Sequence, residues 1–192
     1  MRRSREAKVE THDAIVAKAS QLFRERGVEN TSVGDVMAQA GLTHGGFYRH
    51  FENKDALVAA TVRTAFDGII EVLEDRAAAV GLGDAVKEYF DDYLSDGHVA
   101  NPGIGCPVPS LGSEIARGSD ELKAEFGAGF NRSLAVIAKG LPNEGAPNRD
   151  AAIRELAMRI GAIVIARASD ATTAGEVLQA CRSAGNSRQT KP

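Results

Sequence analysis

The segment from Thr31 to Lys54, TSVGDVMAQAGLTHGGFYRHFENK, constrains this chain more than any other stretch. Its first half predicts a helix of about two turns, because apolar residues recur at i, i+3, i+4 and i+7 and form one stripe. These residues are Val33, Val36, Met37 and Ala40. Gly41 follows at once, and glycine adopts the left-handed backbone that ends a helix at little steric cost. The sequence therefore predicts a helix that stops at a sharp turn.

A second short helix is expected from about His44 to Phe51. Thr43 is placed to cap its N-terminus, and Phe47 and Phe51, four residues apart, share the face that turns inward. Two short helices joined by a tight turn form a helix-turn-helix, in which the second helix enters the major groove of DNA. The residues left on the exposed side and exposed end of this helix are His44, Gly45, Tyr48, Arg49 and His50.

The residues TSVGDVMAQAGLTHGGFYRHFENKDAL resemble the DNA-binding domain of TetR/AcrR-type transcriptional regulators, and the preceding AKASQLFRERGVENTSV continues the resemblance. The shared features are the Ala40-Gly41-Leu42 turn, the Phe47 to Phe51 helix and the following Lys54. One position departs from the pattern, since Gly46 stands where the family usually has Thr, Ser or Ala. Two adjacent glycines weaken a helix by about 1 kcal/mol each relative to alanine.

The resemblance also implies which residues contact DNA. Those that would bind phosphates are Thr31 or Ser32, Thr43, Tyr48, His50 and Lys54. Those that would face the groove are His44, Gly45 and Arg49. Phosphate contacts supply salt-dependent affinity, whereas contacts to base edges set the sequence preference. The alternative is that Tyr48 and His50 only pack against neighbouring helices.

The net charge of −3 is unevenly distributed along the chain. Residues 1–55 carry 9 Lys or Arg against 8 Asp or Glu, a net of +1, and residues 56–192 carry 14 against 18, a net of −4. The N-terminal part is therefore the less acidic one, as suits a polyanionic partner. Four cations near the start form a basic arm that is either simply solvated or functional, namely Arg2, Arg3, Arg5 and Lys8.

The composition, 43% hydrophobic and 26% charged, is that of an ordinary globular chain. No apolar run approaches the ~20 residues that a bilayer span requires. The opening MRRSREAKVE has no apolar core of a signal peptide. We therefore expect a cytoplasmic protein with no membrane partner.

The chain is predicted to be all-α, with about nine helices. The first helix is expected from near Thr11 to Gly27, and Asn53 is placed to cap a long helix that keeps its period to about Ala79. Because this long helix begins where the helix-turn-helix ends, the domain boundary is placed within it, near residue 56. The expected parts are a DNA-binding domain over 1–55, an effector-binding and dimerisation domain over 56–183, and a mobile tail over 184–192.

Seven apolar residues from three predicted helices could converge on a ligand cavity. They are Phe66, Ile69, Tyr89, Phe90, Tyr93, Phe126 and Phe130. Aromatic residues at helical spacing also form ordinary core, so the spacing leaves both interpretations open. The resemblance implies an effector cavity in the C-terminal domain and so keeps a small-molecule effector among the expected partners.

Cys106 lies in GCPVPSLGSE, just before a predicted short helix whose dipole would favour the thiolate. Some TetR-type regulators with a similar Gly-Cys segment sense electrophiles or oxidants through that cysteine. A thiol-based sensor is thus one interpretation, and a small, buried, inert thiol is the other. Cys181 is expected to pack on an apolar helix face. With only two cysteines and no Cys/His cluster, neither a disulfide framework, a metal site nor a cofactor is expected.

A homodimer is expected because one short helix reads few base pairs, and specific sites usually repeat one helical turn of DNA apart. The last two predicted helices carry small and β-branched residues that allow close approach to a symmetry mate. The expected interface residues are Ala157, Ile160, Gly161, Val164, Val177 and Leu178. The alternative is that they form the core of a single chain.

Together these features predict a ligand-responsive repressor that binds a palindromic double-stranded DNA operator and is released by a small molecule. An enzyme is not expected, because the sequence has no phosphate-binding glycine loop, nucleophile elbow or paired metal ligands. Two alternatives remain: a Cys106 sensor on the same scaffold, and an activator or architectural DNA-binding protein without an effector.

Overall fold

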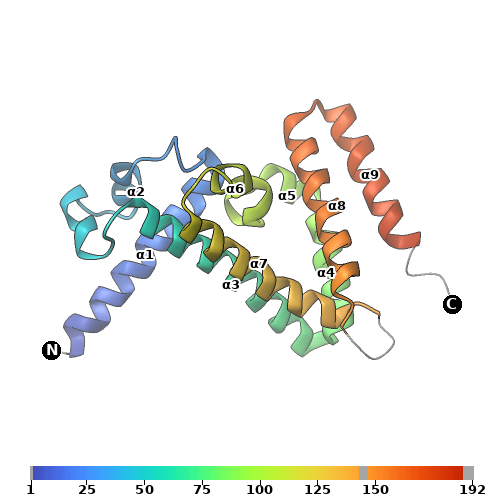
Figure 1. Ribbon diagram of the computed structural model, residues 1–192, viewed down its shortest axis with the longest axis horizontal. Helices are drawn as coiled ribbons and strands as arrows, with labels where there is room; N and C mark the ends of the chain where they lie inside the picture. The colour runs from blue at the N-terminus through green and yellow to red at the C-terminus, as the bar shows by residue number, and fades with distance from the viewer. Residues whose placement is uncertain (1, 143–146, 188–192) are drawn as a thin grey trace. The chain divides into compact units, whose positions relative to one another are not determined.

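The computed structural model describes residues 2–142 and 147–187 (Figure 1). Within these residues it has nine α-helices, two 3₁₀ helices and no strand, which confirms the all-α class. The helices of the first half are α1 (Arg2–Arg26), α2 (Val33–Gln39), η1 (His44–Arg49), α3 (Lys54–Val80) and α4 (Leu82–Tyr93). Those that follow are α5 (Asp96–Ala100), η2 (Pro102–Ile104), α6 (Pro107–Ile115), α7 (Asp120–Gly140), α8 (Arg149–Ala168) and α9 (Ala171–Ser187). No described helix is both long enough and apolar enough to cross a bilayer.

The chain divides into two compact units, each made of two stretches. The first unit holds residues 1–67 and 103–129, and the second holds 68–102 and 130–192. The predicted helix-turn-helix therefore shares a unit with α6 and the first part of α7. The predicted boundary near residue 56 separates DNA binding from effector binding. The division into compact units reflects packing only, so this boundary stays a prediction. Of the expected tail, 184–187 belong to α9, and 188–192 lie outside the described residues.

The core of the first unit is formed by the apolar faces of its first four helices. α1 contributes the predicted stripe, which is fully buried: Ile15, Ala19, Leu22 and Phe23. The buried residues that close against it are Val36 and Met37 of α2, Phe47 of η1, and Leu57 and Val58 of α3. The periodicity of the sequence thus identified the inward faces of these helices.

The first helix begins earlier than expected, at Arg2 rather than near Thr11. Its apolar stripe starts only at Ile15, so the periodic pattern gave no sign of the preceding turns. Those turns are rich in Arg, Glu, Ala and Lys, which favour helix even where no apolar face is buried.

The turn between the two short helices is formed as predicted. Ser32 caps α2 through a capping box, in which its hydroxyl accepts from the Asp35 N–H at 3.1 Å and the Asp35 carboxylate accepts from the Ser32 N–H at 2.9 Å. Gly41 has a φ of +71°, and the Leu42 N–H donates a hydrogen bond to the Met37 carbonyl at 2.8 Å. The left-handed glycine therefore ends α2 as the sequence indicated.

The second short helix differs from the expected one in type and length. It is a six-residue 3₁₀ helix, η1, instead of an α-helix reaching Phe51. Thr43 occupies the N-cap position, but its hydroxyl makes no capping hydrogen bond. Gly45 and Gly46 lower the helix propensity of the first turn, and i to i+3 bonds such as Gly46 N–H to Thr43 O at 3.0 Å take over.

The second unit has its own core, drawn from α3, α4, α7 and α8. The buried residues are Leu73, Val86, Phe90, Leu134, Ile137, Ala138, Ala152 and Leu156. α9 packs on α8 within this unit, as the two neighbouring helices at the C-terminal end of Figure 1 show.

Two left-handed glycines of the first unit should respond differently to alanine. Gly41→Ala is expected to cost about 1–2 kcal/mol of unfolding free energy, because the added Cβ meets nothing within 4 Å and only the backbone is strained. Gly27→Ala, at a φ of +86°, should cost more, because its Cβ would lie 2.8 Å from Oε1 of Glu114. Urea denaturation of the full chain measures both losses.

Gly45→Ala is the matched control for these two variants. Its backbone is not left-handed and an added Cβ meets no atom within 4 Å, so a gain of up to about 1 kcal/mol is expected. Equal losses at Gly27 and Gly41 would contradict the close approach of Glu114.

Candidate nucleic-acid interface

One face of η1 is polar and exposed to solvent. The opposite side is buried through Phe47 of η1 and Phe51 just after it. Phe47 is 1% exposed and stacks on Phe51 with 5.6 Å between ring centroids. Tyr48 is 67% exposed, with its ring edge-on to that of Phe47. The other residues expected to meet DNA from this region are also exposed: Thr43, His44, Gly45 and Arg49. The arrangement leaves hydroxyl, imidazole and guanidinium groups together on one surface.

The two hydroxyl residues before α2 have different surroundings. Thr31 is fully buried, and its hydroxyl donates to the Gly27 carbonyl at 2.8 Å. Ser32 is exposed at the N-terminus of α2, where backbone N–H groups and a hydroxyl suit a phosphate oxygen. Of this pair, only Ser32 has an exposed side chain, so a DNA contact by Ser32 stays a prediction.

Lys54 lies at the first position of α3, half-buried. Its Nζ donates to the Val28 carbonyl at 2.6 Å. An ammonium group has three donors, so two remain for a phosphate. Asn53 caps α3 as expected, its side-chain oxygen accepting from the Ala56 N–H at 2.8 Å.

His50 is half-buried just after η1, and its Nδ1 is buried with no hydrogen-bond partner among the described residues. Burial lowers the pKa of His50, and the neighbouring His12, Lys8 and Arg49 lower this pKa further. Burial and these neighbours all disfavour the charged imidazolium form. The ring also lies near His12, which stacks on Phe51 at 4.8 Å.

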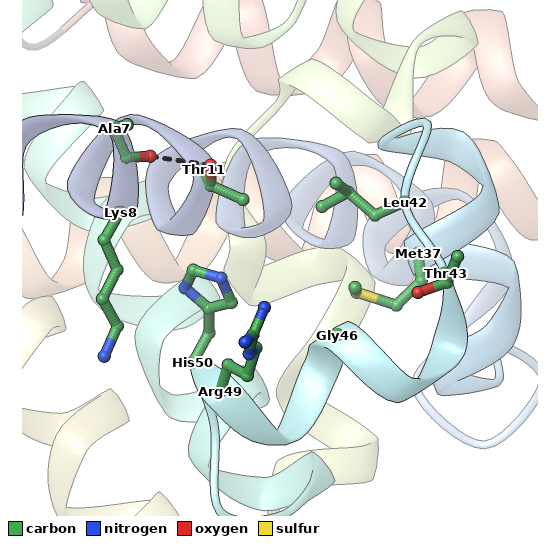
Figure 2. Close-up of a pocket in the computed structure, with 9 residues that line it drawn as sticks. All are labelled: Ala7, Lys8, Thr11, Met37, Leu42, Thr43, Gly46, Arg49 and His50. Atoms are coloured by element: carbon green, nitrogen blue, oxygen red, sulfur yellow. Dashed lines mark hydrogen bonds between the residues drawn. The ribbon is translucent and has the colours of Figure 1, made fainter. Parts of the chain in front are cut away.

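A cleft of about 690 Å³ opens between α1 and the helix-turn-helix, and Figure 2 shows its lining side chains. The walls come from α1 on one side and from α2, the turn and η1 on the other. The lining residues are Ala7, Lys8, Thr11, Met37, Leu42, Thr43, Gly46, Arg49 and His50. Three of the predicted DNA-contacting residues, Thr43, Arg49 and His50, thus share a cleft with α1.

Glu114 of α6 holds the loop that leads into α2. Its carboxylate accepts from the Val28 N–H at 2.7 Å and from the Glu29 N–H at 3.2 Å. Because Lys54 binds the Val28 carbonyl, both backbone polar groups of Val28 are satisfied by side chains. Nothing local in the sequence signals this contact, since Glu114 is 86 residues from Val28.

The seven residues expected around an effector are divided between the two units. Phe66 and Phe126 belong to the first unit, where their rings meet edge to face at 5.3 Å between centroids. The others are buried or half-buried in the second unit: Ile69, Tyr89, Phe90, Tyr93 and Phe130. Within each unit these side chains take part in core packing, and a cavity that they line stays a prediction.

The second unit also buries a charge that sequence reasoning missed. The Arg159 guanidinium lies 4.0 Å from the centroid of the Phe90 ring and pairs with Glu155. The i, i+4 spacing of Glu155 and Arg159 is the sequence signal for this pair. A buried cation needs such a partner because its desolvation is costly.

Cys106 is buried, with 8% of its surface exposed, at the N-cap position of α6. The Arg24 guanidinium lies close by and donates to the Gly105 carbonyl at 3.0 Å. Burial lowers the pKa of Arg24, and the nearby Cys106 opposes this shift. Cys181, on α9, is half-buried.

The residues expected at a dimer interface have unequal exposure. Leu178 is buried within the second unit, and Ile160 packs against the core of that unit, so these two belong to the single chain at least in part. Ala157 and Val164 are exposed, and Gly161 and Val177 are half-buried.

Residues 15–61 match the family model described as "Bacterial regulatory proteins, tetR family". Over this segment the chain is similar to the TetR family. The matched residues run from the buried face of α1 through η1 into α3, which is the part of the first unit that builds the interface.

Relatives of this chain are named as transcriptional regulators. HTH-type transcriptional repressor DhaR from Mycobacterium sp. (strain GP1) is 29% identical over 124 residues, 62% of this chain and 60% of that protein. HTH-type transcriptional repressor Rv3405c from Mycobacterium tuberculosis (strain ATCC 25618 / H37Rv) is 35% identical over 128 residues, 64% of either protein. The chain therefore spans less than two thirds of the length of these relatives.

The fold of this chain also agrees with that of a solved structure. The crystal structure of a TetR-family transcriptional regulator from Cytophaga hutchinsonii matches with a TM-score of 0.73 at 22% identity, over 92% of this chain and 94% of that one. At this level of identity the likeness concerns the fold alone.

Removing the Glu114 carboxylate should loosen the loop before α2. In Glu114→Ala, the Val28 and Glu29 amides lose their acceptor, and hydrogen exchange at these two amides should become faster. Hydrogen bonds to a charged group contribute about 1.5–3 kcal/mol, so the unfolding free energy should fall by a similar amount. Glu114→Gln keeps one acceptor oxygen and should lose less. Unchanged exchange at both amides in the alanine variant would show that the loop is held by other contacts.

Proposed function

We propose that this chain is a ligand-responsive, sequence-specific DNA-binding regulator, a repressor that a small molecule releases from its operator. The observation that carries the proposal is the exposed polar face of η1 seated on buried Phe47 and Phe51. A short helix held in this way can enter the major groove with its exposed side chains against base edges. The names of DhaR and Rv3405c as repressors support the same function.

The proposed contacts divide into two groups. Donors at the edges of the helix-turn-helix would bind phosphates and set its register on the duplex: Ser32, Thr43, Tyr48, His50 and Lys54. His44, Gly45 and Arg49 would face the groove, where an arginine can pair with both guanine acceptors. Gly45 has open space beside it, so the backbone there can approach the bases closely.

We propose that the regulator works as a homodimer built on α8 and α9. α8 leaves an apolar stripe in solvent, with Val164 45% and Ile165 46% exposed and Ile153 and Ala157 further along the same helix. Gly161, between them, meets nothing within 4 Å, which permits close approach of another helix. Two copies would present two η1 helices to a palindromic operator.

In the proposed mechanism the effector binds in the region from residue 56 to 183 and the long helix α3 carries the change to the DNA-binding part. α3 contributes residues to both compact units. If effector and DNA oppose each other, each lowers the affinity of the other by the same factor, and about 3 kcal/mol of coupling changes affinity more than a hundredfold. The relatives' names do not favour the alternatives of a Cys106 sensor or of an effector-independent activator.

Selection of bound duplexes from random DNA by the full chain tests DNA recognition. A palindromic sequence should be enriched, and Arg49→Ala should then weaken binding to it by about 1–3 kcal/mol while relaxing the preference at one base position. Tyr48→Phe should weaken binding to every duplex alike, by up to about tenfold, because it removes a phosphate donor. Lys18→Ala, at an exposed cation of α1 that is outside the cleft lining, is the control. Retention of no duplex by wild-type protein at low salt would refute the proposal.

Charges placed on the exposed stripe of α8 should separate the dimer. Val164→Glu combined with Ile165→Glu is expected to give a monomer in sedimentation velocity, because two unpaired carboxylates would be buried against the partner. Val72→Glu, at a residue of similar exposure on α3, is the control and should leave the oligomeric state unchanged. A dimer that survives the double substitution would place the interface elsewhere.

A further inference from the structure

The cleft between α1 and η1 has a positive lining. Its nine lining residues include the cations Lys8 and Arg49 and no carboxylate. Figure 2 shows Lys8 and Arg49 on opposite sides of the His50 ring. Neither cation has an ion pair or a side-chain hydrogen bond with the described residues, although carboxylates are common on α1.

The carboxylates closest in sequence to Lys8 point away from it. Glu6 and Glu10 lie two positions on either side of Lys8, and on a helix of 3.6 residues per turn such residues project about 200° away. Lys8 shares its face with Thr11, whose hydroxyl donates to the Ala7 carbonyl at 2.7 Å. Among the described side chains of α1, Lys8 is therefore the cation that lines the cleft.

The His50 ring lies between the two cations of the cleft lining (Figure 2). After burial, the causes that lower its pKa are the neighbouring His12, Lys8 and Arg49. Two of these three neighbours are the cations of the cleft lining, so a group between Lys8 and Arg49 experiences a positive field. An anion placed there would be stabilised by the same field.

We propose that this cleft receives a phosphodiester group of the DNA backbone, held by Lys8, and that α1 is thus a third DNA-contacting element beside the helix-turn-helix and the start of α3. The proposal rests on the proposed function, because Arg49 and Thr43 line the cleft and also belong to the DNA-facing surface. Because η1 forms one wall of the cleft, a duplex bound at η1 would have its backbone near the cleft.

The exposure of the lining favours a backbone over a small molecule. Sites for small molecules bury most of the ligand surface. Of the nine lining residues only Met37 is buried, while Lys8, Thr43 and Arg49 are exposed. An open, cationic cleft suits a long polyanion that passes across it.

The test is the salt dependence of duplex binding by the full chain. Lys8→Gln should lower the slope of log affinity against log salt by about 0.9, the value for one phosphate contact, so that between 50 and 200 mM salt the variant loses about three- to fourfold less affinity than wild type. Preference for the selected duplex over a scrambled one should be unchanged, because a phosphate contact carries no sequence information. Lys8→Arg should retain the wild-type slope.

Lys18→Gln on the same helix is the matched control and should retain both slope and affinity. A wild-type slope in Lys8→Gln, with DNA binding intact, overturns the assignment of Lys8. Saturable binding of inorganic phosphate that Lys8→Gln abolishes, together with a wild-type slope for DNA, also overturns it and assigns the cleft to a small anion. If the wild-type chain retains no duplex, the proposed function itself fails, which is a separate outcome.

Discussion

The position of η1 depends on the burial of two phenylalanine rings. A six-residue 3₁₀ helix with two glycines has little stability of its own. Phe47 and Phe51 stack on each other, and Phe51 stacks in turn on His12 of α1. Burial of one such side chain contributes about 1.5–3 kcal/mol. The aromatic base, rather than helix propensity, therefore holds Tyr48 and Arg49 out toward solvent, and the proposed DNA contacts of η1 depend on it.

A second constraint acts one loop earlier, at Val28. Its N–H is held by Glu114 of α6 and its carbonyl by Lys54 of α3. The start of α2 is thus positioned by two helices that follow it in the chain. Lys54 therefore has two roles: it holds the loop through the Val28 carbonyl, and it is a proposed phosphate contact. A change in the position of α6 would alter the hydrogen bonds that keep this loop in place.

The local sequence pattern predicted which faces of the helices are buried, but it did not predict where α1 begins or the helix type of η1. The stripes of α1 and α2 and the left-handed turn at Gly41 were predicted, because each depends on residues within about two turns of one another. The start of α1 was missed because its first turns bury no apolar stripe. The 3₁₀ form of η1 was missed although Gly45 and Gly46 had been recognised as weakening its first turn.

The sequence by itself determined the all-α class, the helix-turn-helix and the division of η1 into an aromatic inner face and a polar outer face, since periodicity and backbone preference act over a few residues. Only the tertiary structure decided that Thr31 is buried while Ser32 is exposed, that Glu114 caps a loop 86 residues away, and that Lys8 faces the cleft beside Arg49. These features depend on which surfaces meet when distant helices pack. How two helices pack depends on the apolar surface that both of them bury. The sequence of one helix alone does not contain this information.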